Sequence, residues 1–159
     1  MSIIKVLLVG KTGCGKTTWM QRLISGQFVK DHVVSAADES YVVEWGIGDG
    51  YFHVDVTSNQ RHVGDYDFVY VMFDHDGGAR EGMDTAIWYH QQNYRVVLLG
   101  TKFDLHDFVN DHPISHDDLR NNQIYYFDMS AKNNYNYHGA FNYTWQEMDH
   151  APIVAKVVA

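Results

Sequence analysis

An octapeptide near the start of the sequence, Gly10-Lys11-Thr12-Gly13-Cys14-Gly15-Lys16-Thr17, constrains the chain more than any other segment. It follows an apolar run at residues 3–9 and precedes a segment, residues 16–25, whose apolar side chains recur at helical spacing. The pattern G-x-x-x-x-G-K-[ST] between a buried strand and a helix is typical of loops that bind nucleotide phosphates. We call residues 10–17 the glycine loop and expect it to bind a nucleoside triphosphate.

The chemistry of phosphate binding explains the residue types in this loop. Glycines let successive backbone N–H groups point inward at a phosphate, and the helix that begins near Lys16 adds its positive end. Lys16 would contact the β- and γ-phosphates, and the Thr17 hydroxyl would ligate Mg²⁺. The motif alone does not decide between adenine and guanine, or between a hydrolase and a kinase.

The rest of the chain alternates strand-like and helix-like segments, which predicts an α/β fold with a mostly parallel sheet. We expect six strands, at residues 3–9, 41–45, 51–56, 68–73, 95–99 and 124–127, the second and third forming a hairpin. Helices are expected at residues 16–25, 81–93 and 137–148, and Ser115 has the features of the N-cap of another helix. The chain has 159 residues and no internal repeat, so we expect a single domain.

Composition narrows the partners and the compartment. A formal net charge of −8 argues against nucleic acid as a partner. The single cysteine, Cys14, excludes an internal disulfide and suits the cytoplasm or the nucleus. No apolar run approaches the ~20 residues of a membrane helix, and no C-terminal cysteine could carry a prenyl group. We therefore expect a soluble monomer without a membrane anchor.

Two further motifs select guanine. The tetrapeptide Thr101-Lys102-Phe103-Asp104 follows an expected strand, and its aspartate can accept both N1–H and N2–H of guanine, a pair that adenine does not offer. The lysine stem of this motif can cover one face of the base. After the last expected strand, backbone N–H groups of Ser130-Ala131-Lys132 can meet the guanine O6. All three motifs lie at carboxyl ends of strands, where open α/β sheets bind their ligands.

With these motifs the chain resembles the small GTPases, which are P-loop NTPases with a Ras-like three-layer sandwich. Within them it is most similar to the Ran subfamily of nuclear-transport GTPases, through residues 25–28 (SGQF), 69–74 (VYVMFD) and 119–141 (LRNNQIYYFDMSAKNNYNYHGAF). The resemblance implies GTP or GDP with Mg²⁺ as cofactors, and importin-type transport receptors or Ran-binding proteins as partners. It makes residues 1–159 one G domain without the acidic C-terminal extension of Ran.

The resemblance also implies roles for individual residues. Phe28 would pack on the guanine, Ser35 would take the place of the first-switch threonine, and Asp55 would be the aspartate of the D-x-x-G motif. The predicted nucleotide-binding residues are Gly13, Cys14, Gly15, Lys16, Thr17, Thr18, Phe28, Ser35, Ser58, Thr101, Lys102, Asp104, Ser130, Ala131 and Lys132. The predicted Mg²⁺ ligands are Thr17, Ser35 and Asp55.

Three departures from the family pattern surround the expected γ-phosphate. Ser58 stands where a glycine N–H usually meets that phosphate, Asn59 stands where a glutamine usually positions water, and Thr12 replaces a glycine. We therefore expect GTP hydrolysis to be slow or absent, with Gln60 and Asn59 as the candidate catalytic residues. One alternative is an ordinary cycling GTPase in which a local register shift brings Gln60 into use. A P-loop kinase or ATPase is a further alternative, which the guanine motifs disfavour.

Another departure concerns partners. Asn121 and Asn122 occupy the place of a basic cluster in Ran-like proteins, and residues 107–118 are acidic where that family is basic. Like charges across an interface slow association and reduce specificity. We therefore expect weak or selective binding to importin-type receptors.

Overall fold

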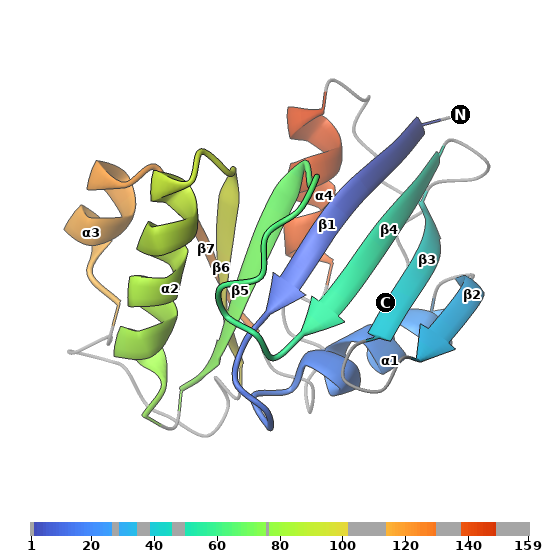
Figure 1. Cartoon of the computed structure of the whole chain (residues 1–159), viewed down its shortest axis with the longest axis horizontal. Helices are drawn as coiled ribbons and strands as arrows, with labels where there is room; N and C mark the ends of the chain where they lie inside the picture. The colour runs from blue at the N-terminus through green and yellow to red at the C-terminus, as the bar shows by residue number, and fades with distance from the viewer. Residues whose placement is uncertain are drawn as a thin grey trace.

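The structure, a computed structural model, describes residues 2–26, 29–34, 39–45, 50–75, 77–101, 114–129 and 138–148. Strands and helices alternate along these residues, so the chain is an α/β protein (Figure 1). The elements are β1 (Ser2–Val9), α1 (Lys16–Gly26), β2 (Val29–Val34), β3 (Glu39–Trp45), β4 (Gly50–Thr57), β5 (Phe68–Asp74), α2 (Ala79–Gln91), β6 (Val96–Thr101), α3 (His116–Asn121), β7 (Tyr125–Asp128) and α4 (Gly139–Glu147).

The described strands form one sheet in the order β2-β3-β4-β1-β5-β6-β7. The five strands β4, β1, β5, β6 and β7 pair with one another in parallel. Strand β3 pairs antiparallel with both β4 and β2. All six predicted strands are present, including the hairpin of β3 and β4. The prediction is one strand short, because β2 adds a seventh at the edge beside β3. Its pattern VKDHVV has no clean alternation, so pairing with β3 rather than local sequence defines it.

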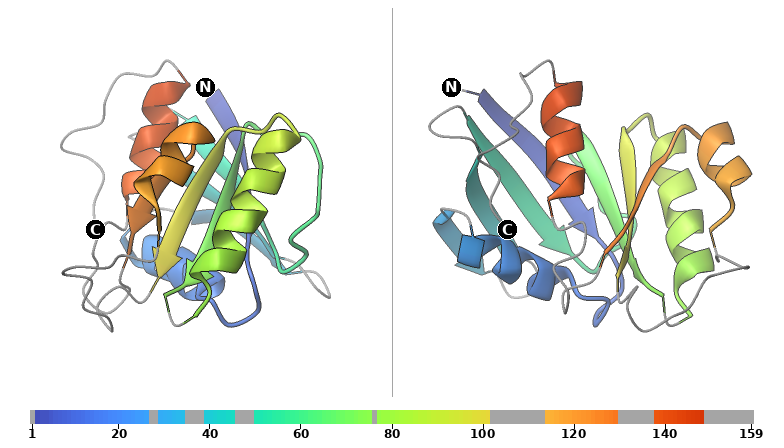
Figure 2. Two further views of the ribbon diagram at one scale, coloured as in Figure 1. Left: turned by 90° about the vertical axis from the view of Figure 1, so that its left-hand side faces the viewer. Right: turned by 180° about the vertical axis from the view of Figure 1, so that it is seen from behind.

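Helices cover both faces of the sheet, which gives three layers (Figure 1; Figure 2). On one face α1 and α4 enclose a core whose largest side chains include Trp19, Met20, Leu23, Phe52, Phe141 and Trp145. On the other face α2 packs over β5 and β6, and α3 adds Leu119 to a core that also includes Val71, Phe73, Met83, Tyr89 and Leu98. The central strands β5 and β6 are apolar along almost their whole length because both of their faces are buried.

Helices α1 and α3 begin where the sequence predicts, whereas α2 begins two residues earlier than predicted and α4 two residues later. Trp19 and Leu23 are four residues apart on α1, both are buried, and the Trp19 ring stacks on Phe141 of α4 with centroids 5.2 Å apart. The hydroxyl of Ser115 accepts a hydrogen bond from the backbone N–H of Asp118 at 3.3 Å, which caps α3. The burial of Trp19 and Leu23 fixes α1 against the sheet, and with it the loop that precedes α1.

The parallel strands direct three chain segments to the same edge of the sheet. The glycine loop follows β1, and β5 and β6 end beside it at Asp74 and Thr101, which are register partners. In open α/β sheets the crevice outside these carboxyl ends is the usual ligand site. The candidate site therefore lies at this edge of the sheet.

Candidate functional site

The glycine loop turns sharply between β1 and α1. Gly13 and Gly15 have φ angles of 89° and 106°, a region that side chains bearing a Cβ rarely adopt. The N–H of Cys14 donates to the carbonyl of Lys11 at 3.2 Å, and α1 begins with the bond from Trp19 N–H to the Gly15 carbonyl at 2.9 Å. The first N–H groups of a helix have no partner within it, so this turn can accept an anion.

Lys16 folds back into the loop. Its side chain is buried, and Nζ donates to the carbonyls of Gly10 at 2.7 Å and Lys11 at 2.9 Å. Burial lowers the pKa of Lys16, while the neighbouring Cys14 and Glu39 side chains oppose that shift. Burial also raises the pKa of the Cys14 thiol, which therefore stays protonated near neutral pH. The Lys16 amino group is therefore held inside the glycine loop by two backbone carbonyls.

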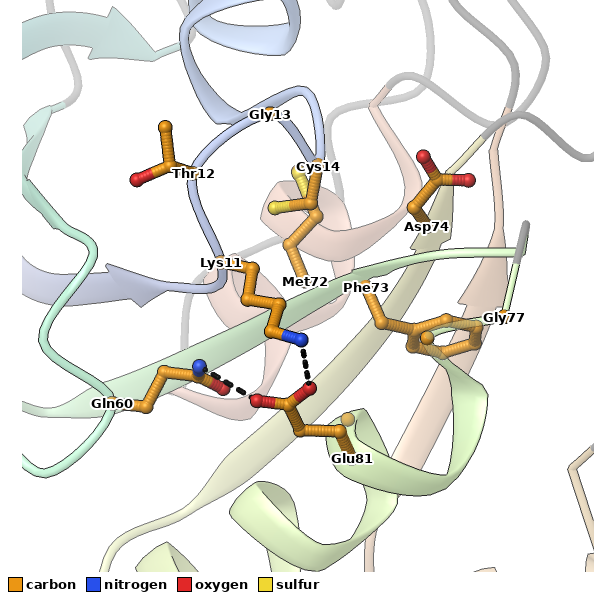
Figure 3. A pocket seen from close by; sticks show the side chains of 12 residues that line it. Lys11, Thr12, Gly13, Cys14, Gln60, Met72, Phe73, Asp74, Gly77 and Glu81 are labelled. Atoms are coloured by element: carbon orange, nitrogen blue, oxygen red, sulfur yellow. Dashed lines mark hydrogen bonds and ion pairs between the residues drawn. The ribbon is translucent and has the colours of Figure 1, made fainter.

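Two cavities lie on opposite sides of the glycine loop, and Thr12 and Gly13 border both. The first, which we call the α1-side cavity, has a volume of about 270 Å³ and is lined among others by Lys16, Thr17, Thr18, Glu39, Thr57 and Ser58. The second, the α2-side cavity, has a volume of about 210 Å³ and is lined among others by Lys11, Cys14, Gln60, Asp74 and Glu81 (Figure 3). Lys16, Thr17 and Thr18 therefore line a different cavity from Gln60, which shares its cavity with Gly13 and Cys14.

Two of the three departures from the family pattern contact each other. The Thr12 hydroxyl donates to the Ser58 hydroxyl at 3.1 Å, which joins the glycine loop to the end of β4. Asn59 lines neither cavity. Its backbone N–H donates to the Thr57 hydroxyl at 3.0 Å, and its side-chain oxygen accepts from the backbone N–H of Arg61 at 3.1 Å. Asn59 thus closes a local turn and lies outside the cavity that contains Lys16 and Thr17.

Gln60 is bound to α2. Its side-chain nitrogen donates to Glu81 at 3.2 Å, and its side-chain oxygen accepts from the Thr85 hydroxyl at 3.1 Å. Lys11 reaches the other oxygen of Glu81 at 2.8 Å, so Lys11 and Gln60 converge on one carboxylate (Figure 3). The hydrogen bond from Lys11 is the main reason that the pKa of Glu81 lies below its usual value, and the bond from Gln60 adds to it.

Beyond Gln60, residues 61, 62 and 64 of the segment between β4 and β5 also contact α2 or the turn after it. The Tyr89 hydroxyl donates to the His62 carbonyl at 2.7 Å, and the Tyr94 hydroxyl donates to the Gly64 carbonyl at 2.7 Å. The guanidinium of Arg61 lies 4.9 Å from the centre of the Trp88 ring. Sequence reasoning missed these contacts because they join residues more than 20 positions apart and leave no local pattern.

The structure does not bring Asp55 to Thr17. Along β4 the side chains of residues 52, 54 and 56 enter the core beneath α1 and α4, so Asp55 lies on the opposite face. Its carboxylate accepts hydrogen bonds from the Ser40 hydroxyl at 2.7 Å and the Tyr66 hydroxyl at 2.8 Å, and His53 lies 3.5 Å away. The alternating apolar residues of this strand already indicated that orientation.

The carboxylate beside Thr17 is that of Glu39, which sequence reasoning did not select. The Thr17 hydroxyl lies 3.3 Å from one oxygen of Glu39 and 3.5 Å from the other. The Tyr41 hydroxyl donates a short hydrogen bond to the same carboxylate. The signal was available, since Glu39 has the same parity as Tyr41, Val43 and Trp45, whose side chains are buried on that face.

One residue of the predicted base motif is described and touches the glycine loop. The hydroxyl of Thr101, at the end of β6, donates to the Cys14 carbonyl at 2.7 Å, with the Phe73 carbonyl 3.1 Å away. This contact places the start of the tetrapeptide next to the loop. Seven predicted ligands lie outside the described residues: Phe28, Ser35, Lys102, Asp104, Ser130, Ala131 and Lys132.

Comparison of the sequence with models of known protein families finds no match. Among the residues that the structure describes, no group of three or more His, Cys, Asp or Glu side chains is arranged to hold a metal ion. Within the same residues, no helix has both the length and the apolar character that a membrane crossing requires.

Proposed function

We propose that the protein is a Ran-like member of the small GTPases that holds GTP or GDP with Mg²⁺ and hydrolyses GTP slowly or not at all. The observation that carries the proposal is the glycine loop itself. It follows a buried parallel strand, turns at Gly13 and Gly15, and holds the Lys16 ammonium among backbone carbonyls at the start of α1. That arrangement suits the β- and γ-phosphates of a nucleotide.

The residues of the α1-side cavity fit a nucleotide with its metal. Lys16 would neutralise phosphate charge, and the first N–H groups of α1 would donate to phosphate oxygens. Mg²⁺ prefers oxygen ligands and usually combines one or two carboxylates with substrate phosphates, so it does not need a cage made only of protein. The hydroxyl of Thr17 and a carboxylate from the cavity wall would hold it. When bound, the ion supplies charge that stabilises the phosphates.

The preference for guanine rests on the sequence motifs and on one contact. The hydrogen bond from Thr101 to the Cys14 carbonyl supports a base site that is continuous with the phosphate site. Asp104 would then accept the two guanine N–H groups. Buried polar groups reject a ligand that leaves them unpaired, so adenine nucleotides should bind far more weakly.

The position of Gln60 supports slow hydrolysis. Attack on the γ-phosphate requires a positioned water, and a displacement of about 1 Å can cost about 100-fold in rate. Gln60 is instead engaged by Glu81 and Thr85 on the other side of the glycine loop. The Thr12 side chain, bonded to Ser58, occupies the rim that both cavities share. These contacts favour a module that acts while nucleotide is bound over a cycling enzyme.

The charges on α3 support weak binding to receptors that have an acidic surface. This helix carries Asp117 and Asp118 in its first turn, and its Arg120 forms an ion pair with Asp117. A receptor with an acidic surface would therefore meet little free positive charge there. We propose importin-type receptors or Ran-binding proteins as the partner class, with binding weakened by this helix.

Calorimetry with nucleotide-free protein tests the assignment. In the presence of Mg²⁺, GDP and GTP should bind tightly, whereas ADP and ATP should bind at least about 100-fold more weakly, the discrimination expected of a site built to pair with the base. Asp104→Asn is the matched control. This variant should bind GDP more weakly than wild type does and should prefer xanthosine diphosphate. Equal affinity for ADP and GDP would show that the guanine assignment is wrong.

Single-turnover hydrolysis tests the second half of the proposal. The intrinsic rate should lie at or below the order of 10⁻⁴ s⁻¹ that is typical of the related GTPases. Strong stimulation by a Ran-type activating protein would support the cycling alternative instead.

A further inference from the structure

The register of β3 and β4 decides which acidic side chain faces the glycine loop. Glu39 pairs with Val56, and Ser40 pairs with Asp55. Directly paired residues project to the same face of a sheet, and Val56 is buried in the core beneath α1. Glu39 therefore projects to the side of α1 and Thr17, while Ser40 and Asp55 project to the opposite side, where they bond at 2.7 Å.

The spacing of the Glu39 and Thr17 oxygens suits a shared cation. Their separations of 3.3 Å and 3.5 Å exceed the usual range for an O–H···O hydrogen bond, which is about 2.5–3.0 Å. Two neighbouring ligands of an octahedral Mg²⁺, each at about 2.1 Å, lie about 3 Å from each other. The hydrogen bond from the Tyr41 hydroxyl orients the carboxylate, and Glu39 lines the α1-side cavity together with Lys16 and Thr17.

We infer that Glu39 supplies the carboxylate of the Mg²⁺ site beside Thr17, in the place that the motif match gives to Asp55. The inference rests on the proposed function, since the remaining ligands would be phosphate oxygens and water. Glu39 and Thr17 come from β3 and α1, so a metal held by both would join the first strand of the hairpin to the helix after the glycine loop. Asp55 has a structural role in holding Tyr66 and Ser40.

The decisive experiment measures how Mg²⁺ slows the release of a fluorescent GDP. Protein is loaded with the labelled GDP, and its dissociation rate is followed as Mg²⁺ is titrated. Glu39→Gln should raise the Mg²⁺ concentration that gives half of the slowing by about tenfold or more, the scale on which losing support for a bound metal lowers affinity. Asp55→Asn is the matched control, because it makes the same carboxylate-to-amide change on the strand paired with β3. Asp55 does not face Thr17, so this variant should shift that Mg²⁺ concentration less than about twofold.

A metal-free arm separates a ligand from a merely structural residue. In EDTA, Glu39→Gln should release GDP no faster than wild type, because it removes an unscreened negative charge beside the phosphates. Faster release by a similar factor with and without Mg²⁺ would overturn the inference in favour of a structural role. Tyr41→Phe removes only the hydroxyl that orients the carboxylate and should give a smaller shift in the Mg²⁺ titration. Glu39→Asp keeps the charge and should fall between wild type and Glu39→Gln, which preserves the test if the glutamine variant does not fold.

The outcomes also distinguish this inference from the proposed function. If Asp55→Asn shifts the Mg²⁺ titration and Glu39→Gln does not, Glu39 is not the ligand, and guanine-nucleotide binding stands. If wild-type protein binds no labelled GDP, or releases it at the same rate at every Mg²⁺ concentration, the proposed function itself fails.

Discussion

The two sides of the glycine loop differ in how their polar groups are held. On the α1 side, Lys16 is buried and bonded to backbone carbonyls, and Thr17 faces the carboxylate of Glu39. On the α2 side, Lys11 and Glu81 form an ion pair whose side chains are 69% and 44% exposed. The first arrangement is built into the backbone, whereas exposed ion pairs contribute little to stability. The residues proposed to bind phosphate and Mg²⁺, Lys16 and Thr17, are therefore held independently of the residues that hold Gln60.

The largest expected effect comes from the lysine of the α1 side. Lys16→Ala should weaken GDP binding by about 100-fold, because charge-assisted hydrogen bonds to phosphate are each worth about 1.5–3 kcal/mol. Lys11→Ala is the matched control within the same loop. Its ammonium contacts Glu81 at the protein surface, so GDP affinity should change less than about threefold. Titration calorimetry at fixed Mg²⁺ measures both.

The same two variants test whether the two sides of the loop act independently. Equal losses of affinity for Lys11→Ala and Lys16→Ala would mean that the nucleotide contacts both sides of the loop. The small change in GDP affinity expected for Lys11→Ala should be the same when Glu81 is also replaced. The double variant Lys11→Ala with Glu81→Ala checks this.

The second prediction concerns the rim between the two cavities. Thr12→Gly, Ser58→Gly and Asn59→Gln together should raise the single-turnover rate of GTP hydrolysis by tenfold or more, since water positioning tolerates displacements of only about 1 Å. Thr12 and Ser58 share a hydrogen bond, so their effects should be non-additive in a double-mutant cycle.

A second set of variants distinguishes the alternative in which Gln60 is catalytic. Glu81→Ala with Thr85→Val removes both side-chain partners of Gln60 and leaves Thr12 and Ser58 unchanged. Hydrolysis in this variant should stay at the wild-type rate. A rate that rises as much as in the triple variant would mean that release of Gln60 is sufficient, as the cycling alternative requires.

The sequence predicted most of the fold because its strongest patterns are local. The apolar run of β1, the helical spacing of Trp19 and Leu23, and the N-cap at Ser115 each depend on residues a few positions apart. The edge strand β2 was missed because its definition depends on pairing with β3.

The candidate site was predictable only in part. Lys16 and Thr17 lie where the motif places them, at the start of α1 and in the α1-side cavity. Matching a motif by position put Asp55 with them, although strand parity points its side chain to the other face and brings Glu39 instead. The attachment of Gln60 to α2 could not be read from the sequence, because it depends on how two distant segments pack.

The third prediction is a pH dependence specific to the α1 side. Burial lowers the pKa of Lys16 in the nucleotide-free protein, and bound phosphates would raise it again. Binding then takes up a proton once the pH exceeds the lowered pKa, so GDP affinity should fall as pH rises through it, by at most about tenfold per unit. Calorimetry in buffers of different ionisation enthalpy measures the proton uptake. If Lys16→Met still takes up a proton when it binds GDP, the proton goes to a group other than Lys16.

The smallest expected effect is confined to the α2 side. Thr85→Val removes the hydroxyl that donates to Gln60 while keeping a buried side chain of similar shape. One hydrogen bond contributes about 1 kcal/mol, so local opening and amide exchange near Gln60 should increase about fivefold, with little change in the global unfolding temperature. Glu81→Gln keeps an oxygen for Gln60 and loses only the charge that Lys11 contacts, so it should raise exchange less. Hydrogen-exchange mass spectrometry of residues 58–67 gives both values, and GDP affinity serves as the internal reference. If either variant changed GDP affinity as much as it changed exchange, the two sides of the loop would be coupled rather than separable.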